Sequence, residues 1–187
     1  AVAGLGAFGV SNSYVQAIGI IILAIVAAIG YGIVHDQITA RICLEYFTIG
    51  HPRLIDSESP TVLGLFWGVV ATWWVGLPLG VGLAMAARAG RRPKLQVPQL
   101  IRPLLMLLGC MFLVAMVAGL IGYTTSKMGL FRLAEPLASD VPRHKHTAFL
   151  TDGWAHAGSY LAGTVGGVTL CFRTWRRRGS AATKGEP

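Results

Sequence analysis

The sequence predicts an all-α fold: an integral membrane bundle of four transmembrane helices, with a helix or loop on its extracytoplasmic surface. The first observation is composition, since 53% of the 187 residues are hydrophobic and only 13% are charged, unlike ordinary soluble domains. The second is four apolar runs of about 20 residues or more, the length that crosses about 30 Å of hydrocarbon. The third is an uneven distribution of charge among the connecting segments, which sets an orientation.

The four expected spans are residues 14–34, 61–87, 100–123 and 148–172. Each is expected to be helical, because a single segment in lipid has to satisfy its backbone hydrogen bonds internally. Pro78 is expected to kink the second span, since proline removes one helical hydrogen bond. The spans form a single transmembrane domain over residues 1–187, and a basic tail, residues 173–187, follows the last of them.

Lys and Arg residues indicate the side that each loop faces, because short cytoplasmic loops are enriched in them. One set of segments carries ten cations and one acid: Arg88, Arg91, Arg92, Lys94, Arg102, Arg173, Arg176, Arg177, Arg178 and Lys184, with Glu186. The other set, after span one and before span four, carries six cations and seven acids. Both chain ends are therefore predicted to be cytoplasmic. Anionic lipid of the bilayer is the expected partner of the basic residues, and no nucleic acid is expected.

Polar side chains gather in two segments on the predicted outer side. The first segment, "HDQITARICLEYFTIGHP" at residues 35–52, contains His35, Asp36, Glu45 and His51. Neither glycine nor proline interrupts residues 35–49, so span one is expected to continue beyond the membrane or to bend into a surface helix. On a helix, Arg41 would reach the carboxylate of Asp36 or of Glu45. Gly50 is expected to end this helix in the left-handed conformation.

The second polar segment, "HKHTAFLTDGWAHAGSY", covers residues 144–160. Asp152 and His156 are four residues apart, which places both side chains on one face of span four near its outer end. Such groups are costly in a membrane unless they are paired or bound to an ion. Asp152 can also be explained as a helix cap with no further role. Tyr160 is expected to orient His156, whereas His144 and His146 are expected to be solvated.

Imidazoles and carboxylates are the ordinary ligands of zinc, iron, manganese and copper, and the topology brings both segments to one face of the membrane. We therefore predict a transition-metal site whose ligands are His35, Asp36, Glu45, His51, Asp152 and His156. The competing interpretation is a metal-free network of ion pairs and hydrogen bonds, since structural networks also gather charge. The residues do not specify a reaction. If the site is catalytic, water at an open coordination position would do the chemistry.

The segments "YGIVHDQITARICLEYFTIGHP" and "FLTDGWAHAGSY" resemble a signature that recurs in a family of uncharacterised bacterial multi-pass membrane proteins. The matching positions are His35, Asp36, Gln37, Arg41, Glu45, Tyr46, His51, Pro52, Asp152 and His156. The resemblance implies a location in the bacterial inner (cell) membrane and carries no activity or cofactor with it. Arg41, Tyr46 and Tyr160 are the expected supporting residues around the site.

Glycines four residues apart allow helix backbones to approach closely. Such pairs are Gly64 and Gly68, Gly76 and Gly80, and Gly163 and Gly167. They suggest a second function class, in which the chain is a structural or accessory subunit that docks on other membrane subunits or on a second copy of itself. A third class, a small transporter, is disfavoured because no acid or base lies deep in any expected span.

Overall fold

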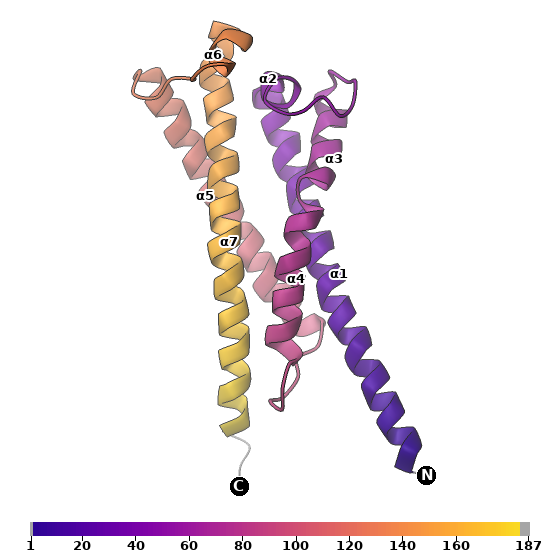
Figure 1. Ribbon diagram of the computed structural model, residues 1–187. Helices are drawn as coiled ribbons and strands as arrows, with labels where there is room; N and C mark the ends of the chain where they lie inside the picture. The colour runs from indigo at the N-terminus through magenta and orange to yellow at the C-terminus, as the bar shows by residue number, and fades with distance from the viewer. Residues whose placement is uncertain (1, 184–187) are drawn as a thin grey trace. The chain divides into compact units, whose positions relative to one another are not determined.

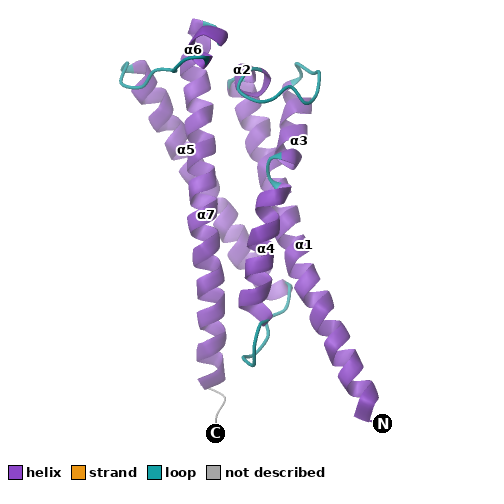
Figure 2. Cartoon of the chain, viewed as in Figure 1, coloured by secondary structure: helices purple, strands orange, loops and turns teal. Residues whose placement is uncertain are grey.

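The computed structural model describes residues 2–183 as helices and loops, with no strand in that range (Figures 1 and 2). The α-helices are α1 (Val2–Ile42), α2 (Leu44–Thr48), α3 (Pro60–Val70), α4 (Trp73–Arg88), α5 (Pro98–Lys127), α6 (Leu137–Asp140) and α7 (His146–Thr183). A 3-10 turn, η1 (Arg143–Lys145), precedes α7. The all-helical part of the predicted fold class is confirmed for these residues.

Three stretches of the described residues are long and apolar enough to cross a membrane: Ser13–Ile42 in α1, Pro60–Arg88 in α3 and α4, and Pro98–Lys127 in α5. They correspond to the first three expected spans. The fourth expected span, residues 148–172, lies inside α7 and is not among them. Glycine, serine and threonine dilute the apolar residues there, so the four-span count stays a prediction.

The first polar segment begins as a continuation of α1 and then bends. Cys43 adopts an extended conformation (φ −144°, ψ 101°) between the end of α1 and the short helix α2. The prediction of a left-handed conformation at Gly50 is wrong. Among the described residues, positive φ angles occur at Gly90 and Gly129 and not at Gly50. Glycine is needed at position 50 for space: a Cβ there would lie 2.6 Å from the carbonyl oxygen of Tyr46 and 2.9 Å from Cζ of Phe149.

The second expected span is divided at Ala71 and Thr72 rather than at Pro78. Helix α3 starts with Ser59, whose side chain accepts a hydrogen bond from the Val62 amide, and with Pro60 in the first turn, a favourable pair at a helix start. Helix α4 starts anew at Trp73 and continues through Pro78. Only one turn of α4 precedes the proline, so little helix is left for it to disrupt.

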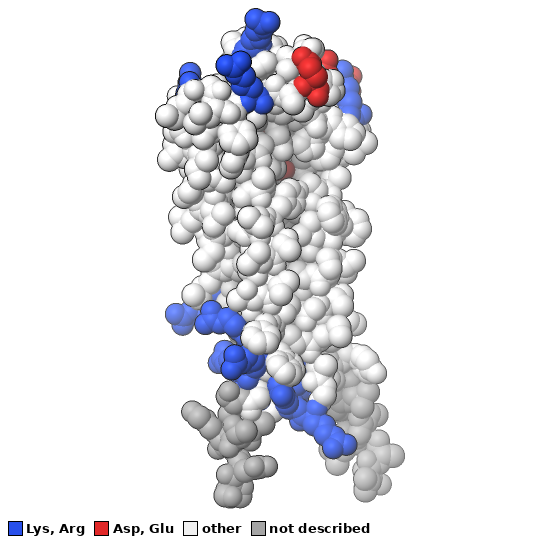
Figure 3. All heavy atoms as spheres, turned by 60° about the vertical axis from the view of Figure 1, so that its left-hand side comes forward, with Lys and Arg blue, Asp and Glu red and all other residues white. Residues whose placement is uncertain are grey.

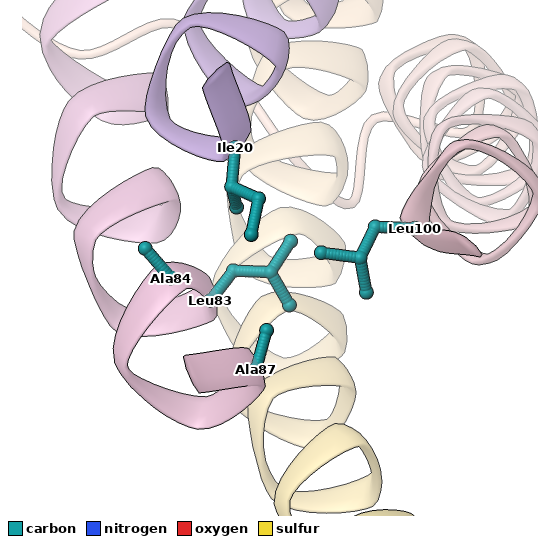
Figure 4. Packing of buried hydrophobic residues seen from close by; sticks show 5 residues of the cluster. All are labelled: Ile20, Leu83, Ala84, Ala87 and Leu100. Atoms are coloured by element: carbon teal, nitrogen blue, oxygen red, sulfur yellow. The ribbon is translucent and has the colours of Figure 1, made fainter. Parts of the chain in front are cut away.

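The chain forms two compact units. Unit 1 comprises residues 1–29, 72–107 and 165–187, and unit 2 comprises residues 30–71 and 108–164. In unit 1 the buried core consists of Ile20, Leu83, Ala84, Ala87 and Leu100 (Figure 4). The described residues of unit 1 include Lys and Arg but neither Asp nor Glu, and Figure 3 shows on one face where Lys and Arg (blue) and Asp and Glu (red) reach the surface.

Arg178 is the largest fully buried side chain in the described part of the chain, at 1% exposure. Its guanidinium donates hydrogen bonds to the carbonyl oxygens of Ala86, Ala89, Arg92 and Pro93, at 2.7–2.9 Å. Burial, followed by the charges of Arg92 and Arg88, lowers the pKa of Arg178. The side chain therefore satisfies carbonyl groups at the end of α4 that the helix itself leaves without partners.

In unit 2, α3 packs on the last turns of α1 through two glycines. A Cβ at Gly64 would lie 2.9 Å from the carbonyl oxygen of Asp36, and one at Gly68 would lie 2.5 Å from the Cα of Ile33. In unit 1, Gly76 and Gly80 of α4 approach α1 in the same way, at Ile25 and Ile21. These glycine faces are thus covered within the chain. Docking of a partner subunit or a second copy through glycine-rich helices stays a prediction.

The substitution Gly68→Ala is expected to destabilise the protein, because the added methyl group would meet the backbone of Ile33 and not a movable side chain. Overpacking of this kind costs about 1–3 kcal/mol. Gly30→Ala in α1 is the matched control, since a Cβ there meets nothing within 4 Å. The free energy of unfolding is measured by adding dodecyl sulfate to the protein in a mild detergent. It should fall for Gly68→Ala and not for Gly30→Ala, and equal values for the two variants would contradict this packing.

Candidate metal centre

Two helices bring the polar residues of unit 2 together. His35 and Asp36 lie in the last two turns of α1, and His156 lies in the first third of α7. His35 is 6% exposed and Asp36 5%, and the side chain of His156 is 12% exposed. The ligand atoms of these three residues lie within 4.8 Å of one another. The prediction that the two remote segments meet is therefore correct for these three side chains.

Asp36 is the centre of this group. Its Oδ1 atom lies 3.1 Å from Nδ1 of His35 and 3.3 Å from Nε2 of His156. The two imidazole rings meet edge to face, with centroids 4.5 Å apart and an interplanar angle of 88°. One carboxylate oxygen therefore faces a nitrogen from each histidine. In apolar surroundings a carboxylate is stable only when such partners compensate its charge.

The contact made by Nδ1 of His156 indicates which ring nitrogen carries the proton. Nδ1 lies 2.8 Å from the backbone carbonyl oxygen of Asp152, which can only accept a hydrogen bond, so Nδ1 carries a proton. In a neutral His156, Nε2 would then present a lone pair to the carboxylate oxygen of Asp36. Two acceptor atoms repel each other at this distance. A proton shared between these two atoms, or a cation bound by both, removes this repulsion.

Two further buried groups at this site are without hydrogen-bond partners among the described residues. They are Nε2 of His35 and both carboxylate oxygens of Asp152. Asp152 is 0% exposed. An unpaired buried polar group normally costs about 1–3 kcal/mol, and more when it is charged, so such atoms point to a proton, an ion or a ligand. The capping explanation of Asp152 receives no support, because its carboxylate oxygens accept no hydrogen bond from the described helix.

Aromatic rings hold the histidines in place. The ring of Tyr46 lies 4.6 Å from that of His156, and Tyr31 stacks on His35 at 5.8 Å. The Tyr31 hydroxyl and the Ser159 hydroxyl share a hydrogen bond of 2.7 Å, which links α1 to α7. Tyr160, one turn beyond His156, is 43% exposed. Tyr46 therefore takes the supporting position in direct contact with the site.

The other predicted ligands have different partners in the structure. Glu45 Oε1 lies 3.1 Å from Nζ of Lys145, and its Oε2 accepts a hydrogen bond from the Cys43 thiol. His51 contacts the backbone oxygen of Tyr46 through Nδ1 at 2.8 Å and packs against the ring of Trp67. Burial is the main cause that lowers the pKa of His51. Neither residue belongs to the three-residue group, and their roles as ligands stay predictions.

Arg41 donates to Gln37 and Thr61 instead of to a carboxylate. This bond pattern ties the end of α1 to the start of α3, so Arg41 supports the site only by positioning the helix. The two histidines expected to be solvated differ from each other. His144 is exposed. His146 is the first residue of α7, and its Nε2 lies 2.9 Å from the carbonyl oxygen of Val141.

Sequence reasoning missed several residues that build the site. Tyr31 lies one helical turn before His35, and that spacing could have indicated the contact. Cys43 is fully buried, and burial, followed by the negative charges of Asp152 and Glu45, raises the pKa of its thiol to about 12. The thiol therefore stays protonated and donates to Glu45. No sequence signal connects Phe149 to Tyr46, although their rings lie 5.1 Å apart.

Comparison with known proteins found no matching family model, curated protein or solved structure. The chemistry of the site therefore has to be inferred from its own geometry.

Stability should depend on Glu45 in mildly acidic solution. Burial alone would raise the pKa of Glu45, but backbone, Lys145 and Cys43 interactions together hold it below its ordinary value of 4.5. Because the folded state holds this carboxylate ionised, its contribution is present above about pH 4.5 and is lost as the pH falls further. We expect Glu45→Gln to cost about 0.5–1 kcal/mol at pH 7.

The measurement is the unfolding free energy from pH 7 to pH 3.5 for wild type, Glu45→Gln and the exposed control Glu58→Gln. The difference between wild type and Glu45→Gln should shrink below pH 4.5, while Glu58→Gln follows the wild type throughout. A difference that is constant with pH would show that the Glu45 charge does not stabilise the fold.

Proposed function

We propose that this chain is a multi-pass membrane protein that binds a transition-metal ion at its extracytoplasmic face through His35, Asp36 and His156. The observation that carries the proposal is the contact between Nε2 of His156 and the buried Oδ1 of Asp36, which lie 3.3 Å apart. In a neutral His156 the proton is on Nδ1, so Nε2 has none. A cation between these atoms removes their repulsion. We favour a metal ion over a proton at this position, because Nδ1 of His35 lies 3.1 Å from the same Asp36 oxygen and provides a third ligand atom.

The spacing of the ligand atoms supports this assignment. Nitrogen and oxygen ligands at about 2.0–2.2 Å from a tetrahedral zinc ion stand about 3.3–3.5 Å from one another. The separations around Asp36 Oδ1, 3.1 and 3.3 Å, are close to these values. Two imidazoles and one carboxylate suit zinc, iron, manganese or copper, and small adjustments of the side chains would accommodate any of these ions.

We further propose that Asp152 completes the charge balance of the site. A divalent ion with two carboxylates is electrically neutral, and neutrality reduces the cost of burial. Both Asp152 oxygens are buried without a partner in the described structure, and the Asp152 backbone already orients His156. Asp152 would thus fill the fourth position or hold a water molecule that does.

Purified protein should retain about one equivalent of metal by elemental analysis. His156→Ala and Asp36→Asn should lose it, and Asp152→Asn should weaken binding by about 10–100-fold, the usual effect of removing a ligand or its close support. His144→Ala and Asp140→Asn are matched controls, because both residues are exposed, and they should keep the ion.

Three predicted ligands, Glu45, His51 and Asp152, lie outside the three-residue group, and Glu45→Ala and His51→Ala test the first two. Loss of metal in either would extend the ligand set. Wild-type protein that is free of metal, and that co-purifies with other membrane proteins, would instead favour the structural or accessory subunit.

We propose four membrane crossings with both chain ends in the cytoplasm, so that residues 148–172 of α7 form the fourth. The support is the division of charge: the described part of unit 1 has cations without acids, whereas unit 2 contains both. The only ionisable acid and base in residues 148–172, apart from Cys171 and Tyr160, are Asp152 and His156, and the proposed site would compensate both.

Labelling with a membrane-impermeant maleimide tests this topology in spheroplasts that express cysteine-free protein with single cysteines. We expect His144→Cys to be labelled, and Arg91→Cys and Arg177→Cys to be protected until the membrane is broken. Labelling of Arg177→Cys in intact spheroplasts would mean that α7 does not cross, and the number of crossings would then be three.

A further inference from the structure

Unit 1 carries a positive charge that no acidic side chain among its described residues balances. Those residues include nine Lys and Arg side chains and neither Asp nor Glu. Four of the nine, Arg88, Arg91, Arg92 and Lys94, lie at the end of α4 and in the loop that follows it. Cations held this close together repel one another unless an anion lies between them. An anion is therefore the ligand that this loop would bind most favourably.

Two of these cations point to the same oxygen atom. Nη2 of Arg88 and Nζ of Lys94 donate hydrogen bonds to Oγ of Ser13, at 3.2 and 3.3 Å. The two charged groups are therefore no farther apart than about twice that distance. A serine hydroxyl can accept both bonds, since its oxygen has two lone pairs, but it is neutral and offsets neither charge. An anionic oxygen at this position would offset both.

The rest of the Arg88 guanidinium has no anionic partner either. Nη1 donates to the carbonyl oxygen of Leu95 at 2.6 Å, and Nε is buried without a partner among the described residues. Ser13 and Arg88 are half-buried and Lys94 is exposed. A ligand from outside the protein can therefore reach the two cations where they converge.

The loop that carries these cations is held in place by the end of α7. Arg178 donates hydrogen bonds to three carbonyl oxygens within residues 89–93. The guanidinium of Arg92 lies 4.3 Å from the centre of the Trp175 ring and donates to the Trp175 carbonyl oxygen. The loop backbone is thus ordered without the use of the two converging cations, and a preordered site loses less entropy when a ligand binds.

The converging cations also lie at the ends of apolar stretches. Ser13 begins the first stretch that is long and apolar enough to cross a membrane, Arg88 ends the second, and Pro98 begins the third. The headgroup region of a bilayer lies at the ends of such stretches, and basic side chains between membrane helices bind lipid headgroups there. The phosphate of a lipid is therefore the anion that a bilayer places next to this pair.

We propose that Arg88 and Lys94 bind the phosphate of one anionic phospholipid, whose unesterified oxygens replace the Ser13 hydroxyl as hydrogen-bond acceptor. The inference rests on the proposed membrane location and is independent of the metal centre, whose three grouped residues lie in unit 2. Hydrogen bonds between a charged donor and a phosphate are about twice as strong as neutral ones. The site differs from the general attraction of a basic surface for anionic lipid, because it depends on two particular side chains and not on net charge.

The test titrates the delipidated full chain in a neutral detergent with phosphatidylglycerol, and native mass spectrometry measures how many lipids bind and how tightly. One lipid should bind at least about tenfold more tightly than phosphatidylcholine, whose choline group the cations repel. Arg88→Gln and Lys94→Gln should each weaken this step about tenfold or more, the usual effect of removing one hydrogen bond to a charged group.

Arg91→Gln is the matched control, because it removes the same charge from the same loop. Arg91 is exposed and makes no side-chain hydrogen bond or ion pair with the described residues. Its removal should change the affinity by less than about twofold, since salt screens an exposed charge that does not touch the ligand. Equal losses in Lys94→Gln and Arg91→Gln would overturn the proposal, because the attraction would then be diffuse.

Ser13→Asp separates lipid binding from a purely structural role of these cations. The new carboxylate should pair with Arg88 and Lys94 inside the protein, so the lipid affinity should fall at least about tenfold while the melting temperature stays equal or rises. Ser13→Asn is the control, since it adds a neutral side chain of similar size and should bind lipid as the wild type does. Unchanged lipid affinity in Ser13→Asp would overturn the proposal.

Inorganic phosphate identifies the source of the anion. In millimolar excess it should leave the bound phosphatidylglycerol in place, because it lacks acyl chains that contact the helices. Displacement of the lipid by phosphate would overturn the lipid assignment in favour of a free anion.

Membrane fractionation of the wild type distinguishes failure of this inference from failure of the proposed function. Protein that separates from the membranes would refute the proposed location, on which both depend. Membrane-embedded protein without a preferred anionic lipid would refute the lipid site alone, and metal-free protein that keeps this preference would refute the metal centre alone.

Discussion

The carboxylate of Asp36 is the constraint on which the rest of unit 2 depends. It lies in one of the longest apolar stretches of the chain and is 5% exposed, and a buried carboxylate is costly unless opposite charge or hydrogen bonds compensate it. His35 and His156 provide that compensation from two helices. Neither α1 nor α7 can therefore shift along the other without exposing this charge to an apolar environment.

The surroundings of Asp36 follow from this requirement. Gly64 lets α3 approach the Asp36 backbone, Tyr46 packs on the ring of His156, and the Tyr31–Ser159 hydrogen bond links the same two helices. Unit 1 is stabilised differently, by a small aliphatic core and by one buried arginine that bonds backbone carbonyl groups. The histidines and the acidic residues of the described chain thus all lie in unit 2, whereas the polar interactions of Arg178 in unit 1 complete a helix end.

Much of the helical layout could be predicted because it depends on local sequence. Runs of apolar residues predict the central part of α1 and both ends of α5 to within about four residues, and Ser59 with Pro60 marks the start of α3. The interruption at Ala71 and Thr72 could not be predicted in this way, since neither residue is a strong helix breaker. Gly50 was correctly identified as a helix end for the wrong reason. Glycine is needed there because a Cβ would lie too close to the carbonyl oxygen of Tyr46 and to the ring of Phe149, which is remote in sequence.

The candidate site shows the same division. Periodicity and side-chain chemistry identified His35, Asp36 and His156 among six predicted ligands, but the sequence could not separate them from Glu45, which pairs with Lys145, or from His51, which packs against Trp67. Composition and apolar run lengths determined by themselves that the chain is helical and suited to a membrane, because those properties add up residue by residue. Only the tertiary structure decided which polar groups share one carboxylate oxygen, because a difference of about 1 Å between side chains from remote helices separates a ligand from a neighbour.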